Sequence, residues 1–297
     1  MAIILKGKPV SDAILERTRN DAQQLRSKGI IPTLAVLRAG EKENDLAYER
    51  GAKKRCESAG VDIRICTLDE NVDAETFYKQ LDELNHDDAV HGILMMRPLP
   101  KQIDEETARK MLLPENDVDG CTDGSLAGVF TDSNTGFAPC TAQAAMEIMD
   151  YYDIDLKGKM VTIIGRSLVI GRPLAMMMMH RQATPTICHH FTPELEKVTK
   201  NADIVVTSAG HAEIFGENYF SAAQTVIDVG ITWSEEKGKL CGDVKFDEAE
   251  PIVQAITPVP GGIGAVTTSV LVSHVVEAAK RRLTRYVTNQ ADRISGQ

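Results

Sequence analysis

The sequence lacks several features that would point to particular classes of protein. No stretch approaches the roughly 18 consecutive apolar residues of a membrane-spanning helix. Only a short apolar run precedes Lys6 at the N-terminus, so we expect neither a membrane span nor a signal peptide. The six cysteines include no CxxC pair, which argues against a zinc site and against a disulfide framework. We therefore expect a cytoplasmic protein without a metal centre.

Acidic residues outnumber basic ones, with 43 Asp and Glu against 33 Lys and Arg. The formal net charge of −10 argues against general binding to nucleic acid or to anionic membranes. A local group of Lys and Arg could still hold a small anionic ligand. With 297 residues, the chain is long enough for two domains that each have a core, and a hydrophobic content of 43% is ordinary for a soluble globular protein.

The segment Lys159–Pro173, KMVTIIGRSLVIGRP, is the most informative part of the chain. Met160–Ile164 is apolar and has no helical period, which predicts a buried parallel strand. The turn Gly165-Arg166-Ser167 follows, and Gly171-Arg172-Pro173 opens a helix. Strand, glycine turn and helix N-terminus in this order form a corner that can bind phosphate. An ordinary strand-to-helix turn of an α/β protein would show the same pattern.

Strands and helices alternate along the chain, which predicts an α/β fold. We expect a first domain over residues 1–140 and a second over 141–264 that repeats the alternation. Ser11-Asp12 is expected to cap a helix that runs to Ser27. Lys237-Gly238-Lys239 is typical of a hairpin tip. Strands are expected at 33–37, 61–68, 90–96, 160–164, 185–189, 203–207 and 225–229.

The strand after the glycine turn bears on the choice of cofactor. In a dinucleotide site this strand ends in an acid that binds the ribose 2′-hydroxyl. Here it ends in Cys188-His189-His190-Phe191, with no acid. Arg166 and the two histidines could instead meet a 2′-phosphate, which favours NADP over NAD. The alternative is that Arg166 is a solvated surface charge and His189 a packed strand end. The spacing GxSxxxG matches the general dinucleotide pattern only loosely.

Two loops could contribute to a ligand site. Asp119 follows the turn-forming sequence PENDV and precedes Gly120, so its carboxylate could accept hydrogen bonds from an amino-pyrimidine edge. A loop aspartate can equally cap its own turn. In the loop Pro258–Gly264, PVPGGIG, prolines add stiffness and glycines let the backbone approach a ligand closely. The alternative for this loop is a rigid connector.

Together these motifs resemble those of the methylenetetrahydrofolate dehydrogenase/methenyltetrahydrofolate cyclohydrolase family of the FolD type. The resemblance runs from one end of the chain to the other, and the Thr257–Gly264 motif is its most specific part. The other motifs are Gly40–Tyr48, Gly92-Ile93-Leu94, Pro98-Leu99-Pro100, Asp117–Gly120, Pro139-Cys140-Thr141, Gly165-Arg166-Ser167, Gly171-Arg172-Pro173, Asp228–Ile231 and Gly242-Asp243-Val244.

The resemblance implies a fold, an activity and a set of site residues. The second domain would be a Rossmann-like doubly wound parallel sheet, the final helix (about 265–297) would join the N-terminal domain, and folate would lie in the cleft between the domains. A homodimer would oxidise 5,10-methylenetetrahydrofolate with NADP and then hydrolyse the 5,10-methenyl cation to 10-formyltetrahydrofolate. The residues assigned to folate are Tyr48, Met96, Asp119, Pro260, Gly261 and Gly262, of which Tyr48 and Asp119 are also catalytic. Those assigned to the cofactor are Gly165, Arg166, Ser167, Gly171, Arg172, Pro173, His190 and Ile231.

The chain departs from its family at three polar positions of the folate site. Four residues after Tyr48 the family has a catalytic lysine, where this chain has Ala52. The family's serine three residues before the tyrosine is Asp45, and the glutamine of its VQLPLP strand end is Met96. Three changes in one site suggest altered chemistry.

Lys53 is the nearest lysine to the family position, but it comes one residue too late. That offset is about 100° round an ideal helix, so only a π-bulge near Gly51 would turn Lys53 toward Tyr48 and give it the catalytic role. Otherwise Lys53 belongs to a solvated basic face.

These departures bear differently on the two reactions. Cyclohydrolase needs a group that activates water, whereas hydride transfer mainly needs two rings held face to face. We therefore expect dehydrogenase activity to survive and cyclohydrolase activity to be weak or absent. Two alternatives remain: a non-catalytic paralogue that binds folate or a partner protein, and an NADP oxidoreductase with a different substrate.

Overall fold

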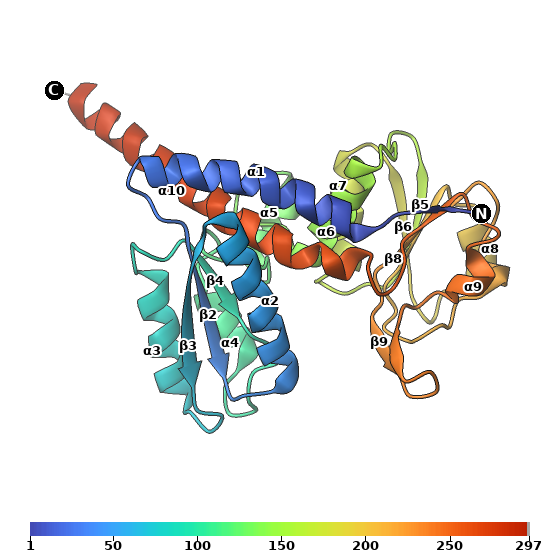
Figure 1. Ribbon diagram of the computed structural model, residues 1–297, viewed down its shortest axis with the longest axis horizontal. Coiled ribbons are helices and arrows are strands. Elements are labelled where there is room, and N and C mark those ends of the chain that lie inside the picture. Colours follow the sequence, from blue (N-terminus) through green and yellow to red (C-terminus); the bar gives the residue numbers. More distant parts are fainter. Residues whose placement is uncertain (296–297) are drawn as a thin grey trace. The chain divides into compact units, whose positions relative to one another are not determined.

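The computed structural model describes residues 1–295, which divide into two compact units that each contain a parallel sheet (Figure 1). Unit 1 contains Met1–Asp12, Gly128–Ser133 and Ala138–Thr267. Unit 2 contains Ala13–Ala127, Asn134–Phe137 and the chain from Thr268 onward. Within residues 1–295, no helix combines the length and the apolar composition needed to cross a membrane.

Unit 2 is built on a three-stranded sheet of order β3-β2-β4, in which β2 pairs in parallel with both neighbours. Both faces of β2 are buried, since Leu34 to Leu37 are all inaccessible to solvent. Side chains of α3 and α4, among them Phe77 and Ala108, form a core cluster with Ala35 and Leu37. The strands are β2 (Thr33–Ala39), β3 (Asp62–Leu68) and β4 (Gly92–Met95), and the helices are α2 (Glu43–Ala59), α3 (Ala74–Asn85) and α4 (Glu105–Met111). Helix α5 (Asp123–Thr131) begins in unit 2, and its residues from Gly128 belong to unit 1.

Two long helices, α1 (Gly7–Ser27) and α10 (Thr267–Ser295), lie side by side (Figure 1). An ion pair between Lys280 of α10 and Asp21 of α1, at 2.5 Å, joins them. The side chain of Val275 on α10 lies only 3.1 Å from where a Cβ on Gly92 would be, so α10 packs directly against the start of β4. The apolar face of the last helix is therefore covered.

Unit 1 is built on a six-stranded sheet of order β1-β11-β8-β7-β5-β6 in which all pairings are parallel. Its strands are β1 (Ile3–Ile4), β5 (Met160–Ile164), β6 (Thr184–Cys188), β7 (Ile204–Thr207), β8 (Thr225–Asp228) and β11 (Ala255–Ile256). From β5 the strands follow in chain order on both sides, β7, β8 and β11 on one and β6 on the other, as in a doubly wound sheet. Strand β1 is added at the edge beyond β11. A hairpin, β9 (Thr232–Ser234) and β10 (Lys239–Cys241), stands apart from this sheet.

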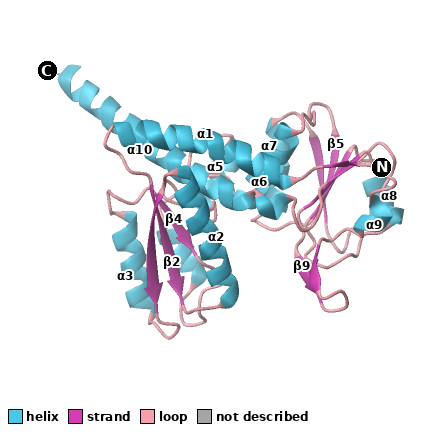
Figure 2. Cartoon of the chain, viewed as in Figure 1, coloured by secondary structure: helices cyan, strands magenta, loops and turns pink. Residues whose placement is uncertain are grey.

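Helices flank the sheet of unit 1 (Figure 2). They are α6 (Cys140–Tyr151), α7 (Gly171–His180), α8 (Leu195–Lys200) and α9 (Phe246–Ala249), with short 3-10 turns η1 (Glu217–Tyr219) and η2 (Ile263–Ala265). A core cluster joins sheet residues such as Val205 and Val226 to Phe215, Phe220 and Ala249. The α/β fold and the parallel second sheet expected from the sequence are confirmed, as is the hairpin tip at Gly238.

The sequence prediction was wrong at the N-terminus. The first helix begins at Gly7, not at Ser11-Asp12, and Ser11 lies buried within it. Proline is accepted in the first turn of a helix, so Pro9 does not delay the start. Ahead of it, Ile3–Ile4 forms the unpredicted strand β1, which pairs with β11 some 250 residues later in the chain. A two-residue strand carries no local pattern that could be recognised.

Candidate active site

The face of α2 that carries Tyr48 is continuous with the buried side of the helix. Ala52 and Cys56 follow Tyr48 at four-residue intervals, and both are fully buried, whereas Tyr48 is half-buried. α2 is regular α-helix from Glu43 to Ala59, so the π-bulge that would have redirected Lys53 is not formed. Lys53 is exposed and lies about 140° round the helix from Tyr48. The suggestion that Lys53 could take the lysine's place is therefore wrong for this helix geometry.

The carboxyl end of the unit 2 sheet brings two candidate segments together, the start of α2 and the loop after β4. The backbone N–H of Met96, just after β4, donates to the carbonyl oxygen of Leu37 on β2 at 2.9 Å. Lys42, which precedes α2, donates through Nζ to the carbonyl oxygen of Pro98 at 3.0 Å. The start of the Tyr48 helix and the loop after β4 are thus in direct contact. The peptide bond between Arg97 and Pro98 is cis, and Met96 is buried.

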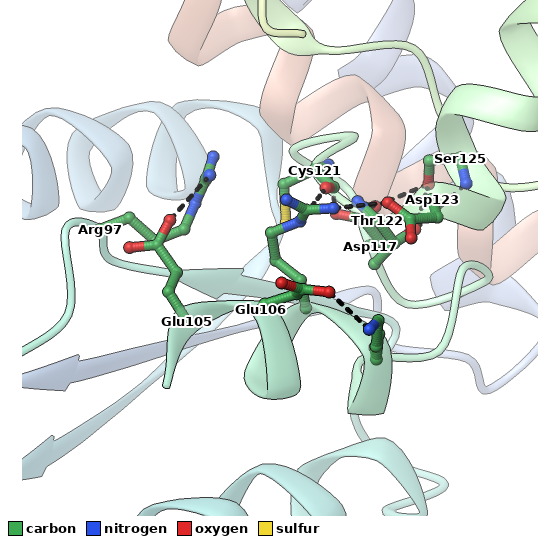
Figure 3. Close-up of polar contacts among 10 residues, drawn as sticks. Arg97, Glu105, Glu106, Asp117, Cys121, Thr122, Asp123 and Ser125 are labelled. Atoms are coloured by element: carbon green, nitrogen blue, oxygen red, sulfur yellow. Dashed lines mark hydrogen bonds and ion pairs between the residues drawn. The ribbon is translucent and has the colours of Figure 1, made fainter. Parts of the chain in front are cut away.

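The loop that carries Asp119 is fixed by its neighbour Asp117 (Figure 3). Asp117 is fully buried, and its carboxylate accepts hydrogen bonds from the backbone N–H groups of Cys121 and Thr122 and from the Ser125 hydroxyl, at 3.0, 2.7 and 2.6 Å. Asp117 therefore caps the turn that follows Asp119. The carboxylate of Asp119 lies beside the guanidinium of Arg97.

Arg97 was not among the residues selected from the sequence. Its guanidinium NH1 lies 3.6 Å from Glu105 Oε1 (Figure 3). NH2 of the same guanidinium lies 3.5 Å from Asp119 Oδ2. Burial acts to lower its pKa, but the surrounding acidic groups, Asp119 and Glu105 among them, raise it more, so the net pKa is above the usual value. Arg97 therefore remains a cation beside Asp119. It occupies the position of the leucine that follows glutamine in the family sequence VQLPLP.

The glycine turn of unit 1 has the close packing expected of a phosphate corner. Gly165 has φ of 130°, and a Cβ there would lie 2.2 Å from Ser208 Oγ. A Cβ on Gly171 would lie 2.0 Å from the carbonyl oxygen of Gly165. Neither position tolerates a side chain. Ser167 Oγ accepts a hydrogen bond from the N–H of Ile170 at 3.1 Å, and this bond shapes the turn before α7 begins.

Most of the predicted cofactor residues lie at the carboxyl ends of the strands of the unit 1 sheet. Arg166 and Arg172 are exposed on either side of the turn, and Pro173 is buried in the first turn of α7. The N–H of Gly165 donates to the carbonyl oxygen of Cys188 at 2.9 Å, which brings the end of β6 and the exposed His190 after it to the same edge. Ile231 follows β8 and is 55% exposed, with β7 between β8 and β5.

Two buried aspartates position the Ile231 loop, and sequence reasoning gave them no role. The carboxylate of Asp228 accepts hydrogen bonds from Thr207 Oγ1 at 2.9 Å and from the N–H groups of Gly230, Asp243 and Val244 at 3.0 to 3.1 Å. Burial raises the pKa of Asp228 to about 7, against the effect of these donors. Asp243 in turn accepts from the backbone of residues 209–211. The family motifs containing Asp228 and Asp243 were the available signal.

The loop containing Pro260, Gly261 and Gly262 is anchored at both sides within unit 1. Thr257, at its start, accepts a hydrogen bond from the N–H of Asp228 at 2.7 Å. The N–H of Gly7 donates to the carbonyl oxygen of Gly261 at 2.8 Å, and a Cβ on Gly7 would lie 2.1 Å from the carbonyl oxygen of Gly262. Gly261 has φ of 102°, and the Val259–Pro260 peptide bond is cis. The loop is thus a rigid segment with defined attachments.

The predicted folate residues therefore fall into two groups, one in each unit. Tyr48, Met96 and Asp119 belong to unit 2, while the Pro260 loop belongs to unit 1 together with the cofactor residues. Within each unit the predicted residues lie on neighbouring strand ends and loops.

Comparison with known proteins identifies the family. Residues 5–119 match the catalytic domain of tetrahydrofolate dehydrogenase/cyclohydrolase, and residues 139–283 match its NAD(P)-binding domain. The bifunctional protein FolD of Carboxydothermus hydrogenoformans is 47% identical over 281 residues, covering 94% of this chain and 98% of that protein.

Solved structures agree with this match. The bifunctional enzyme FolD from Campylobacter jejuni superposes with a TM-score of 0.92 at 36% identity, covering 95% of this chain and all of that one. The Trypanosoma brucei methylenetetrahydrofolate dehydrogenase-cyclohydrolase, in complex with NADP and an inhibitor, gives a TM-score of 0.88 at 32% identity, with 95% and 98% covered. The chain therefore belongs to the tetrahydrofolate dehydrogenase/cyclohydrolase family.

Proposed function

We propose that this protein is an NADP-dependent 5,10-methylenetetrahydrofolate dehydrogenase in which the family's cyclohydrolase step is slow. Membership of the family supports the substrate class and the dehydrogenase reaction. The observation that carries the difference between the two activities is Ala52, a buried methyl side chain on the Tyr48 face of α2, where the family has its lysine.

The residues of unit 1 fit a nicotinamide dinucleotide. Gly165 and Gly171 pack so closely that a Cβ on either would collide with backbone or side chain. The backbone at the start of α7 can therefore approach a pyrophosphate, in keeping with the positive end of the helix dipole. Arg166, Arg172 and His190 are exposed at the same edge and suit a 2′-phosphate, which favours NADP. NADP supplies the hydride acceptor when it is bound.

In unit 2, the proposed residues bind and orient the folate. The carboxylate of Asp119 would accept hydrogen bonds from the amino-pyrimidine edge of the pterin. The ring of Tyr48 would lie along the folate and orient it for hydride transfer. Hydride transfer mainly requires that the two rings are held in the right orientation. It requires no acid or base at position 52.

Hydrolysis of the methenyl cation has a different requirement. Water must be activated and the opening ring stabilised, which is the work of a positioned polar group. The methyl group of Ala52 can do neither, and Lys53 is exposed on another side of α2. Proton transfer by a positioned side chain typically contributes about 100- to 10,000-fold to a rate, so the loss of one such group should slow hydrolysis by a factor in that range.

Separate assays of the two reactions test this proposal. We expect NADP-dependent oxidation of 5,10-methylenetetrahydrofolate at a rate far above the background, and hydrolysis of 5,10-methenyltetrahydrofolate close to the uncatalysed rate. Lys53→Ala serves as the control and should leave both rates unchanged. Rapid enzymatic hydrolysis that is abolished by Lys53→Ala would refute the argument from Ala52. Nucleotide binding without any turnover would instead indicate a non-catalytic paralogue.

Three further properties rest on the family resemblance. We propose that the protein is a homodimer, that it is cytoplasmic, and that residues 1–140 with the final helix serve the folate while residues 141–264 serve the nucleotide.

A further inference from the structure

Arg97 is a charged residue in the folate half of the site to which the family pattern gives no role. It follows β4 directly and occupies the place of an apolar residue in the family motif. Its side chain is 24% exposed, so Arg97 is not fully enclosed by the protein. Its Nε is buried and has no hydrogen-bond partner among residues 1–295.

The guanidinium is held loosely by its protein partners. Its distances to Asp119 and Glu105, 3.5 and 3.6 Å, exceed the roughly 2.7–2.9 Å of a charge-assisted hydrogen bond. A guanidinium carries five N–H donors in a fixed fork. Arg97 therefore keeps donor capacity beside the carboxylate that is proposed to bind the pterin.

The chemistry of the pterin edge matches this pair. A 2-amino-4-oxopyrimidine presents two donors, the 2-amino group and N3–H, followed by one acceptor, the 4-oxo oxygen. A carboxylate can accept from both donors, and the next atom along the edge then requires a donor. The arrangement of Asp119 with Arg97 at its side offers two acceptors followed by a donor.

We propose that Arg97 is a specificity-determining residue whose guanidinium donates to the 4-oxo oxygen of the pterin held by Asp119. This inference rests on the proposed function, because it assumes that a folate occupies the site. It also gives the folate site a positive charge that position 52 does not provide. A site that hydrogen-bonds one group of a ligand discriminates against an analogue in which that group cannot pair.

A purely structural role for Arg97, as a link between Glu105 and the Asp119 loop, is the competing explanation. Arg109 provides a matched control, because it braces the same loop by donating to the Cys121 carbonyl oxygen at 3.0 Å and by pairing with Asp123. An Arg109→Leu variant loosens the loop without removing a group next to Asp119.

The test compares folic acid with its 4-amino analogue, in which an amino donor replaces the 4-oxo acceptor and N3 loses its hydrogen. The change at N3 is the same for every variant, so the role of Arg97 is read from the change in preference between variants. Dissociation constants of both are measured by calorimetry on the full-length protein, its Arg97→Leu and Arg97→Lys variants, and Arg109→Leu. We expect the wild-type preference for the 4-oxo ligand to fall about tenfold in Arg97→Leu and less in Arg97→Lys. Arg109→Leu should lower the melting temperature and leave the preference unchanged.

A preference that is the same in Arg97→Leu as in the wild type would overturn the role of Arg97. Loss of preference in Arg109→Leu to the same extent would also overturn it, because loop order alone would then explain the effect. If the wild type bound neither ligand and did not oxidise 5,10-methylenetetrahydrofolate, the proposed function itself would fail, and the Arg97 inference with it.

Discussion

At the scale of single residues, Ala52 determines what we expect of the chemistry. Its Cβ lies on the buried side of α2, four residues from Tyr48. Restoring the family's amine by Ala52→Lys, together with Met96→Gln, should raise hydrolysis of 5,10-methenyltetrahydrofolate at least tenfold. Dehydrogenase activity should change by less than about threefold. A spectrophotometric assay of methenyl decay measures the first, and an unchanged decay in the double variant would contradict the role given to position 52.

A second prediction for a single residue concerns Asp228 and the dependence of stability on pH. Its pKa is about 7 in the folded protein because it is buried, compared with about 3.9 in an unfolded chain. Between these values the folded state binds a proton that the unfolded state has lost, so stability decreases as pH rises from about 4 to about 7. The slope from this group is at most about 1.4 kcal/mol per pH unit.

An Asp228→Asn variant cannot titrate at this position, so its free energy of unfolding should fall less steeply over the same pH range. Urea denaturation of both proteins at several pH values measures the two slopes. The variant is also less stable at every pH, because an amide cannot accept hydrogen bonds from all four donors. The comparison therefore uses the slopes of stability against pH and not the stabilities themselves. Equal slopes would show that Asp228 is ionised throughout.

At the scale of elements, the junction of β5 and α7 depends on close approach. A Cβ on Gly171 would lie 2.0 Å from the Gly165 carbonyl oxygen, so Gly171→Ala must displace the first turn of α7. We expect the Kd for NADP to rise at least tenfold. Calorimetric titration with NADP tests this, with binding of folic acid measured alongside as the control. NADP affinity equal to that of the wild type would show that this turn does not contact the nucleotide.

Gly51, within α2, has open space where a side chain would lie, unlike Gly171. A Cβ on Gly51 would meet no atom within 4 Å, so Gly51→Ala removes only the helix cost of glycine. The variant should be more stable by about 0.5–1 kcal/mol. A decrease in stability on thermal or chemical denaturation would mean that this exposed surface of α2 is covered by something that the substitution disturbs.

Some elements of this fold could be predicted from the sequence, and others could not. The strand Met160–Ile164 was predicted with its observed bounds, because a short β-branched apolar run before a glycine is a local signal. Strand β1 was missed because it is defined by its pairing with distant β11. Helix α5 was missed because two glycines weaken its helical pattern, so that tertiary packing determines it. Arg97 was missed because its proposed role depends on its contact with Asp119, which no local sequence pattern indicates.

At the scale of the whole molecule, the chain consists of two compact units with separate sheets. The proposed nucleotide residues all belong to unit 1. NADP should therefore slow amide hydrogen exchange in residues 160–175 more than in residues 43–59 of α2. Exchange mass spectrometry with and without NADP measures this. Equal protection of both segments would contradict a nucleotide site confined to unit 1.

We propose that the family's two activities have separated in this chain. The most direct measurement identifies the product formed from 5,10-methylenetetrahydrofolate and NADP, under conditions where uncatalysed hydrolysis of the methenyl cation is slow. We predict that 5,10-methenyltetrahydrofolate accumulates in step with NADPH. Formation of 10-formyltetrahydrofolate at the rate of NADPH production would contradict the proposed separation of the two activities.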